Sequence, residues 1–193
     1  MKFNNSWLLM LALVFALPGM SFAQKNKQFP KDLGGSVNIA SVCDGIPGNL
    51  VANCGFEQRA APSPGWTWSG DMSFTTIDMG APAHSGMWGL DTGPTSMLGF
   101  FTQTLATTAG QSYDLTYWLR NNGRPAQFQI SWDGSVIQDD PASDHPDHVY
   151  TSYTISGLVA SGDTTVLSFG FYNDPDFFWF DDVSVTPSAT GAK

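Results

Sequence analysis

Two adjacent aspartates, Asp181 and Asp182, lie within a segment that otherwise has the pattern of a buried strand. The segment reads FFWFDDVSV over residues 177–185, and its alternation places Asp181 on the same face as Val183 and Val185. Because valines favour the core, this pattern predicts that Asp181 points inward. A buried carboxylate needs compensation, either from backbone N–H donors or from a cation. Ca²⁺ suits such a place because it accepts six to eight oxygen ligands, including backbone carbonyls.

The N-terminus has the features of a secretory signal peptide over residues 1–23. Lys2 precedes an unbroken apolar run from Trp7 to Leu17, and small residues at positions 21 and 23 predict cleavage after Ala23. The apolar run is shorter than the roughly 20 residues that a membrane span requires. We therefore expect a secreted or periplasmic protein without membrane insertion after cleavage, with a retained N-terminal anchor as the alternative.

The remaining chain is acidic and suits one domain. Cleavage removes Lys2 and leaves 170 residues with 7 basic and 17 acidic side chains, a net charge near −10. This balance argues against nucleic acid and anionic membranes as partners. We predict a flexible leader at 24–42, a folded domain at 43–187 and a tail at 188–193.

Cys43 and Cys54 are the only cysteines of the chain. An exported protein meets an oxidising compartment, so the two side chains are expected to form a disulfide. Metal binding by two thiols alone is the weaker alternative.

Short runs of β-type residues, separated by turn residues, follow one another from Asn49 onward. The clearest alternation is at 113–120, and similar runs occur at 66–77, 99–105, 128–132, 153–155 and 167–171. No stretch of a dozen residues has a helical period. We predict an all-β fold, a β-sandwich or jelly roll of antiparallel sheets.

Several motifs resemble, in the expected order, those of carbohydrate-binding modules of the galactose-binding-like jelly-roll type, related to families four, nine and twenty-two. The motifs are NLVANCGFE at 49–57, Gly65-Trp66, HSG at 84–86, FTQTL at 101–105, YDLTYWLR at 113–120 and FDDVSV at 180–185. The resemblance spans about 140 residues. It departs from the family at Cys54, where the opening motif has glycine.

This resemblance implies a structural calcium ion where the first and last strands meet. Carried over by motif, the ligands are Glu57, Asp181 and a carbonyl near Ser85. Glu57 is the only glutamate of the chain. The alternative is that both acids are held by hydrogen bonds alone.

The resemblance also suggests a binding surface for a polysaccharide or glycan. Side chains opposite the expected core combine aromatic rings with hydrogen-bonding groups, as sugar recognition requires. If the strands order as in the family, one concave sheet carries Trp118, Arg120, Gln129, Ser131, Ser168 and Tyr172, and loops place Trp66, Trp68 and Trp88 at its rim.

No catalytic motif of a serine hydrolase, zinc protease or nucleoside triphosphatase occurs. Four aspartates and two histidines gather at 139–148, where two prolines indicate a solvated loop, with a second metal site as the alternative. We therefore expect no enzymatic activity. An exported structural or adhesive protein and a glycoside hydrolase are the alternatives to a carbohydrate-binding module.

Overall fold

The computed structural model describes residues 40–59, 63–123, 125–141 and 148–189. The expected signal peptide and most of the expected leader lie outside these residues. Ser41 is buried and precedes a short 3₁₀ helix, η1, over Val42–Gly45. The domain thus includes the last residues that we assigned to the leader.

Ten strands follow η1 within the described ranges, and the prediction of an all-β fold is confirmed. The strands are β1 Thr67–Gly70, β2 Thr75–Met79, β3 Trp88–Thr92, β4 Gly99–Ala106, β5 Ser112–Asn121, β6 Ala126–Trp132, β7 Ser135–Asp140, β8 Thr151–Val159, β9 Thr164–Asn173 and β10 Phe178–Pro187. Two of them, β3 and β7, have no counterpart among the predicted runs, and 66–77 divides into β1 and β2. None of the helical structure in the described residues is long and apolar enough to cross a membrane.

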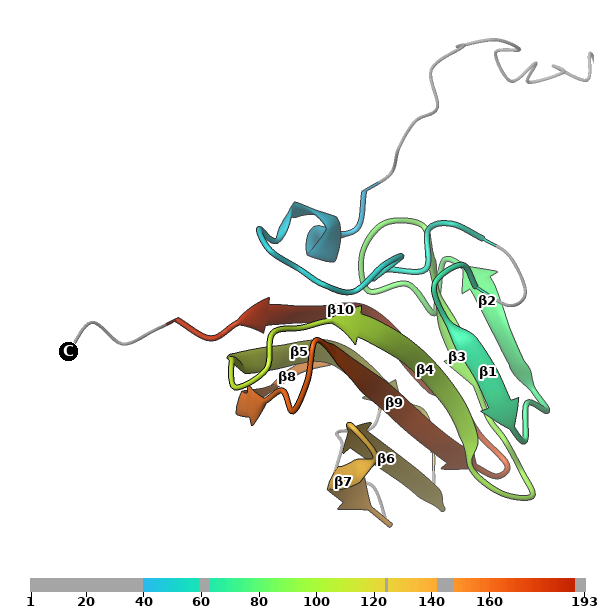
Figure 1. The fold of residues 1–193 in the computed structure, drawn as a ribbon. Helices are drawn as coiled ribbons and strands as arrows, with labels where there is room; N and C mark the ends of the chain where they lie inside the picture. Colours follow the sequence, from blue (N-terminus) through green and yellow to red (C-terminus); the bar gives the residue numbers. More distant parts are fainter. Residues whose placement is uncertain (1–39, 60–62, 124, 142–147, 190–193) are drawn as a thin grey trace, which may run out of the picture. The chain divides into compact units, whose positions relative to one another are not determined.

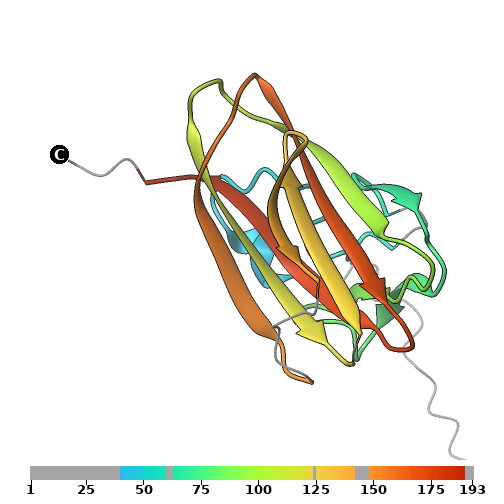
Figure 2. The ribbon, with the colours of Figure 1, turned by 90° about the horizontal axis from the view of Figure 1, so that it is seen from below.

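The strands form two five-stranded antiparallel sheets (Figure 1). One sheet has the order β1-β4-β9-β6-β7, and the other has the order β2-β3-β10-β5-β8. Seen from below, the layer with β6 and β9 lies over the layer with β5 and β10 (Figure 2). Every hydrogen-bonded strand pair is antiparallel. The two packed antiparallel sheets form a jelly-roll β-sandwich, as predicted.

Aromatic side chains fill the space between the sheets. Phe169 of β9 contacts Phe180 of β10 with 4.7 Å between ring centroids, and Tyr117 of β5 contacts Phe128 of β6 at 5.5 Å. All four side chains are fully buried. Such rings bury a large apolar area, and their tilted packing adds to the stability gained from that burial.

The segment between η1 and β1 packs along β10. The Leu50 N–H donates to the Val185 carbonyl at 2.9 Å, and the Val183 N–H donates to the Cys54 carbonyl at 3.0 Å. These bonds bring the beginning of the domain onto its last strand, as the calcium hypothesis requires.

Candidate functional site

A β-bulge in β10 determines where the two aspartates point. The pairing of β10 with β5 shifts register between Asp181 and Ser184, and Asp182 has a φ of 49°. Before the bulge, Phe178 and Phe180 face the core and Asp181 pairs with Trp118 on the outer face. After it, Val185 faces the core opposite Leu115.

The prediction that Asp181 shares the face of Val185 is therefore wrong. Strict alternation fails here because the bulge inserts an extra residue and reverses the phase of the strand. Asp181 is nevertheless fully buried, and Asp182 is 2% exposed. The cover comes from the loop at 80–87, which lies over the outer face of β10 at this point.

Backbone amides hold the Asp181 carboxylate. Its Oδ2 accepts hydrogen bonds from the N–H of His84 at 2.7 Å and of Ser85 at 3.1 Å, and its Oδ1 accepts one from the Asp182 N–H at 2.8 Å. These bonds favour the charged form. Burial and the neighbouring charge of Asp182 act more strongly and raise the pKa of Asp181 to about 9.

The Asp182 carboxylate is only partly satisfied. Its Oδ2 accepts from the Ser85 hydroxyl and contacts His84 Nδ1, both at 2.7 Å. Its buried Oδ1 has no hydrogen-bond partner among the described residues. A buried carboxylate oxygen without a partner is unfavourable, and this one lies beside a second buried carboxylate. Asp182 was not among the predicted ligands, although its place in the DDV motif was visible in the sequence.

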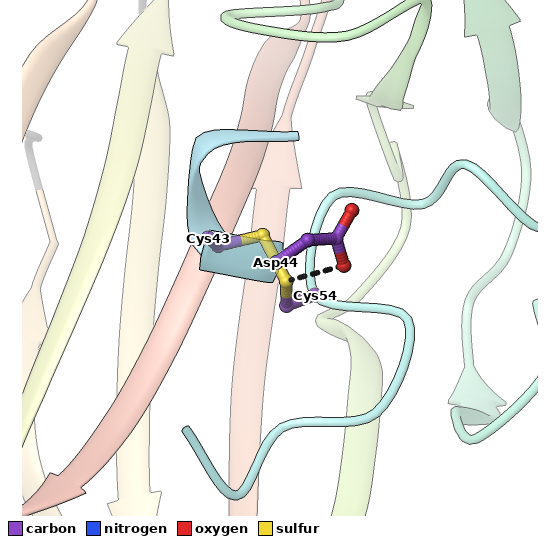
Figure 3. A group of neighbouring side chains, drawn as sticks. All are labelled: Cys43, Asp44 and Cys54. Carbon is purple, nitrogen blue, oxygen red and sulfur yellow. Dashed lines mark hydrogen bonds between the residues drawn. A yellow bond between two sulfur atoms is a disulfide. The ribbon is translucent and has the colours of Figure 1, made fainter. Parts of the chain in front are cut away.

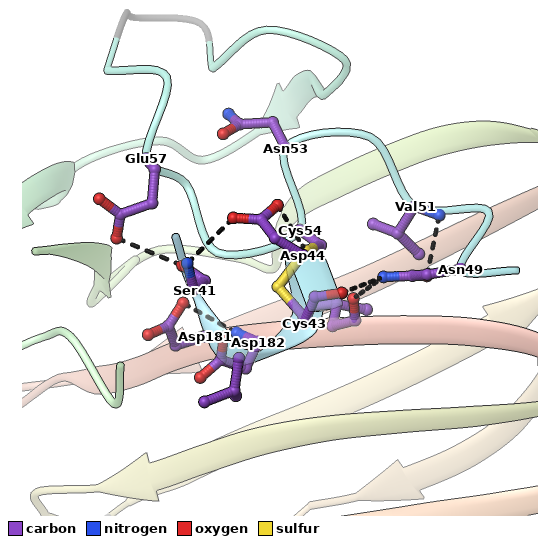
Figure 4. Close-up of a disulfide and its surroundings, with 12 residues drawn as sticks. Ser41, Cys43, Asp44, Asn49, Val51, Asn53, Cys54, Glu57, Asp181 and Asp182 are labelled. Carbon is purple, nitrogen blue, oxygen red and sulfur yellow. Dashed lines mark hydrogen bonds between the residues drawn. A yellow bond between two sulfur atoms is a disulfide. The ribbon is translucent and has the colours of Figure 1, made fainter. Parts of the chain in front are cut away.

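Glu57 binds the end of the loop at 80–87 and the start of β3. Its Oε1 accepts from the N–H of Met87 at 2.8 Å and of Trp88 at 3.0 Å. The Ser41 hydroxyl donates to the same oxygen at 3.3 Å. Figure 4 shows Glu57 and the two aspartates around Ser41 and η1. The structure thus brings the predicted ligands Glu57, Asp181 and Ser85 to one region.

Gly86 permits the close approach of Glu57 to the loop. It has a φ of +67°, and a Cβ atom at this position would lie 2.1 Å from Glu57 Oε1. Any larger residue would displace the carboxylate. The HSG motif therefore has a physical reason for its glycine.

Positive side chains do not balance the acidic pair. Arg59 and Arg120, the arginines within the described residues, lie over tryptophan rings, at 4.7 Å from the Trp88 centroid and 4.0 Å from the Trp179 centroid. The only ion pair found in the described part of the chain joins His84 to Asp182. Compensation for the charge of Asp181 and Asp182 therefore comes from hydrogen bonds, from His84 and from any bound cation.

A second cluster of metal-ligating residue types is a disulfide rather than a metal site. Across the described ranges, only Cys43, Asp44 and Cys54 form a group of three whose ligand atoms all lie within 4.8 Å of one another. The two sulfurs are bonded to each other, which confirms the predicted disulfide (Figure 3). Asp44 Oδ1 lies 3.6 Å from Cys54 Sγ. Because both sulfurs are oxidised, neither cysteine can act as a thiolate ligand for a metal.

The predicted carbohydrate-binding residues do not share one face. Trp118 and Arg120 lie on β5, whereas Gln129 and Tyr172 lie on β6 and β9 of the other sheet. The predicted grouping is therefore wrong. Alternation sorts the two faces of each strand, but it does not show that the chain crosses to the opposite sheet between β5 and β6.

The two predicted binding residues on β5, Trp118 and Arg120, both contact other side chains of the protein. The Trp118 ring stacks on His84 with 3.7 Å between centroids. Arg120 lies over Trp179, its cross-strand neighbour, and its Nε donates to Asn122 at 2.8 Å. These contacts hold the 80–87 loop and the outer face of β10 in place.

The other sheet has a continuous outer face of mixed aromatic and polar character, which we call the β4–β9–β6 face. Strand register aligns its side chains in rows, with Phe100 opposite Gly170, Gly170 opposite Gln129, and Tyr172 opposite Gln127. Its half-buried members are Phe100, Thr102, Gln127, Gln129, Ser131, Ser168 and Tyr172.

Gly170 lets the Phe100 side chain pack closely on the strand in the middle of this face. A Cβ atom here would lie 2.8 Å from the Phe100 ring and 3.5 Å from the Gln129 Cβ atom. The Phe100 ring therefore lies over the backbone of β9, beside Gln129. Phe100 and Gln127 were not predicted, although their outward parity on the predicted strands could have revealed them.

The three tryptophans expected at the rim occupy other places. Trp66 is 4% exposed and packs in the core against Phe56. Trp68 lies on β1 against buried Phe101, with 4.8 Å between ring centroids, and Trp88 lies on β3. The prediction of a tryptophan rim is wrong, because Trp66 belongs to the core and the half-buried rings of Trp68 and Trp88 pack against it.

The acidic segment at 139–148 is only partly a loop. Asp139 and Asp140 belong to β7, and Asp139 accepts a hydrogen bond from the Gln127 side chain at 2.8 Å. Residues 142–147, including one of the two histidines, lie outside the described residues, so the second metal site stays untested.

Comparison with solved structures shows the same architecture in glycan-binding proteins. A family 61 carbohydrate-binding module, solved in complex with β-1,4-galactotriose, matches 72% of this chain and 98% of its own length, with a TM-score of 0.57 and 16% identity. The chain has the jelly-roll fold of carbohydrate-binding modules. No protein-family model and no curated protein sequence matches it.

Further matches place this jelly-roll fold both in separate modules and within enzymes. A family 22 xylan-binding domain from Paenibacillus barcinonensis matches 69% of this chain and 90% of its own length, with a TM-score of 0.50 and 15% identity. A Clostridium thermocellum xylanase, solved as a family 22 module joined to its catalytic module in complex with xylohexaose, matches over 30% of its length, with a TM-score of 0.54 and 18% identity.

Proposed function

We propose that this protein is a non-catalytic module that binds a polysaccharide or glycan along the β4–β9–β6 face. The observation that carries this proposal is the composition of that face, on a fold whose structural neighbours bind galactotriose and xylan. Half-buried Phe100 and Tyr172 offer apolar ring surfaces. The Gln127 and Gln129 amides offer both donors and acceptors.

This combination suits sugars for a physical reason. The C–H faces of a sugar ring pack on aromatic rings, whereas its hydroxyls require directional hydrogen bonds. A face built from aligned rows on neighbouring strands is also open at both ends, so it can accept the interior of a chain. Neutral glycans avoid repulsion from the strongly acidic protein.

The test is a glycan array followed by polysaccharide pull-down, with xylan and β-1,4-galactan among the probes. Replacing Tyr172 with Ala removes a ring from the face and is expected to weaken binding at least tenfold, which corresponds to about 1.4 kcal/mol. Tyr172→Phe keeps the ring and should retain most of the affinity.

A second pair of variants tests whether an amide side chain on the β4–β9–β6 face contributes to binding. Gln129→Ala is expected to weaken binding, whereas Gln111→Ala, in the turn before β5, should not. No binding to any probe, or equal effects of the two glutamine variants, would remove the β4–β9–β6 face from consideration.

We further propose that a structural Ca²⁺ ion binds between Glu57 and the β10 aspartates, with Asp182 as an additional ligand. The unpartnered Asp182 Oδ1 and the scarcity of nearby positive charge support this assignment. The ion would neutralise buried carboxylates and tie the segment before β1 to the last strand. The ligand atoms of Glu57, Asp181 and Asp182 do not all lie within 4.8 Å of one another, so binding of one shared ion would draw these side chains together. Backbone oxygens would complete the set of six to eight ligands.

Thermal unfolding tests the calcium proposal. A ligand that binds only the folded state stabilises it by about 2.7 kcal/mol at one hundred times its Kd, so calcium should raise the Tm of a chelator-treated sample. Glu57→Gln should abolish this increase, and Asp163→Asn, at an exposed site, should preserve it. An unchanged Tm in wild-type protein with and without calcium would exclude a tightly bound ion.

We also propose that the protein is exported and loses residues 1–23. The Cys43–Cys54 disulfide supports an oxidising compartment. Mass spectrometry of protein recovered from the periplasm or the medium should find Gln24 at the N-terminus. Recovery of a reduced, full-length chain from the cytoplasm would contradict this.

A further inference from the structure

Strand β8, Thr151–Val159, forms an edge of its sheet. In the described part of the chain, β5 is the only strand that pairs with it (Figure 1). Every second residue of an antiparallel strand points its N–H and C=O away from a given neighbour, so an edge strand offers a row of hydrogen-bonding groups to another strand. Proteins usually protect such edges with short strands, charged side chains or bulges.

The other three edge strands of the sandwich carry protection of this kind. β1 has only four residues and ends at Gly70, whose φ is 75°. β2 carries the exposed Asp78, and β7 carries Asp139 and Asp140. A partner strand would therefore meet a short edge or a carboxylate at each of these three places.

Charged residues are absent from β8 and from the positions on both sides of it. No Asp, Glu, Lys or Arg occurs over 149–162, in a chain with 17 acidic and 8 basic residues. The net charge of −9 makes two copies of this chain repel each other in general. The β8 edge is a place where a second copy can approach without bringing carboxylates of the two strands opposite each other.

A bulge limits the regular part of this edge to Thr151–Ile155. The pairing of β8 with β5 shifts register between Tyr113 and Leu115, and Gly157 at this point of β8 has a φ of 79°. The five residues before the bulge pair with β5 in one unbroken register. They form the stretch that is available to a partner strand.

Apolar side chains of β8 are incompletely covered. Tyr153, Ile155 and Leu158 pack against the core but stay half-buried. Val149 and Val159, which flank the regular part of the strand, are 60% and 57% exposed. A strand added to this edge would remove part of this apolar surface from water, which favours association.

We propose that two copies of this protein pair through their β8 edges. The two strands would run antiparallel around a two-fold axis near Tyr153, so that the same residues of both copies form the contact. The two sheets that contain β8 would then become one continuous sheet. The contact uses the one open edge of each copy, so the assembly closes at a dimer. A pairing of this length buries little area, and we therefore expect the dimer to be reversible.

Pairing at β8 leaves the β4–β9–β6 face free, because that face belongs to the other sheet. The two-fold axis between antiparallel strands is perpendicular to their sheet, so both copies would present this face on the same side. The dimer would then bind a polysaccharide at two places, which raises the apparent affinity through the effective concentration of the second site. This consequence rests on the proposed function, whereas the pairing itself does not.

Sedimentation equilibrium of the exported protein tests the pairing. The expected mass is twice that of one chain at high protein concentration, and it should fall toward that of one chain on dilution. Ser152→Lys/Thr154→Lys places like charges at the two exposed positions of the regular stretch and should weaken dimerisation at least tenfold. Because these lysines reduce the net negative charge, general repulsion between copies would not explain the loss.

The matched control is Thr76→Lys/Met79→Lys, which makes the same charge change at exposed positions of β2, the opposite edge of the same sheet. It should dimerise as the wild type does. Hydrogen exchange of the wild type requires no substitution, and it should be slower over 151–155 at high than at low protein concentration.

A wild type that has the mass of one chain at every concentration would overturn the proposal. A dimer that the β8 lysines leave intact, or that shows no protection over 151–155, would overturn it as well. None of these measurements includes a glycan, so failure of the pairing and failure of glycan binding are separate results.

Discussion

Asp91 shows at the level of one residue how this sandwich tolerates acidic side chains on its outer surface. It lies on β3, and register places Trp179 of β10 opposite it, with Arg120 of β5 next in the row. Its Oδ1 is buried and has no hydrogen-bond partner in the part of the chain that the structure describes. Burial raises its pKa to about 6, and the charges of Asp78 and Asp176 add to this, whereas a hydrogen bond from Trp179 opposes it.

The raised pKa of Asp91 predicts a specific pH dependence of stability. The folded state binds this proton more tightly than the unfolded state, whose aspartate pKa is about 3.9. The stabilisation from Asp91 is therefore present at low pH and is lost as the pH rises through 6. Asp91→Asn should reduce the fall in the free energy of unfolding between pH 4.5 and 7.5, measured by urea denaturation, while the part that comes from the raised pKa of Asp181 remains.

Asp139→Asn is the control for this measurement, because Asp139 lies exposed on β7. It should leave the pH dependence as in the wild type. If Asp91→Asn and the wild type lose stability in parallel over this range, Asp91 does not titrate near pH 6.

Single residues could be predicted from the sequence where a motif or a chemical rule fixed them. Cys43 and Cys54 followed from their residue type and the expected export. Glu57, Asp181 and Ser85 followed from the motifs of the resemblance. In the structure, Glu57 and Asp181 both contact the loop at 80–87, which contains Ser85. The orientation of Asp181 could not be predicted, because a bulge depends on how two strands pair and not on the alternation within one.

At the level of elements, the disulfide links η1 to the segment that runs along β10. The two cysteines are 11 positions apart. Closing a loop of this size restricts the unfolded chain and stabilises the fold by about 3 kcal/mol. Reduction of the wild-type protein should lower the free energy of unfolding by about this amount, measured by urea denaturation with and without reductant.

A Cys43→Ala/Cys54→Ala variant completes the test. It should have the stability of the reduced wild type, less the contribution of two buried sulfur atoms, and it should not respond to reductant. Equal stability of the oxidised and reduced wild type would show that the bond adds nothing to the fold.

The close packing of Phe100 on Gly170 gives a prediction for the β4–β9–β6 face. Gly170→Ala would bring a methyl group against the Phe100 ring, which must move outward. Overpacking of this kind typically costs about 1–3 kcal/mol. The variant should lose stability within that range and also bind glycan more weakly. Ser152→Ala, at an exposed position of β8, is the control and should change neither stability nor glycan binding.

The strands themselves were largely predictable, whereas their assignment to sheets was not. Runs at 113–120, 128–132 and 167–171 became β5, β6 and β9, since each alternates clearly. The strands β3 and β7 were missed because they are short and mix glycine or aspartate with apolar residues. Which strands share a sheet depends on contacts between distant segments. For this reason the sequence did not show that Trp118 and Gln129 lie on different sheets.

At the level of the whole molecule, the two sheets present outer faces of different kinds. The outer face of β10 and β5 is covered in part by the 80–87 loop and engaged in contacts among His84, Trp118, Arg120 and Trp179. The β4–β9–β6 face carries no such stacked pairs on Tyr172 or Gln129 among the contacts of the described residues. This asymmetry favours the second face as the one that meets a ligand.

The most direct test of this account is calorimetric titration of the protein with the glycan that binds best on the array. The account predicts saturable binding that Tyr172→Ala weakens at least tenfold and that Trp118→Ala leaves within about twofold, provided that each variant is folded by circular dichroism. The opposite pattern, with Trp118→Ala abolishing binding and Tyr172→Ala retaining it, would contradict the assignment of the glycan to the β4–β9–β6 face.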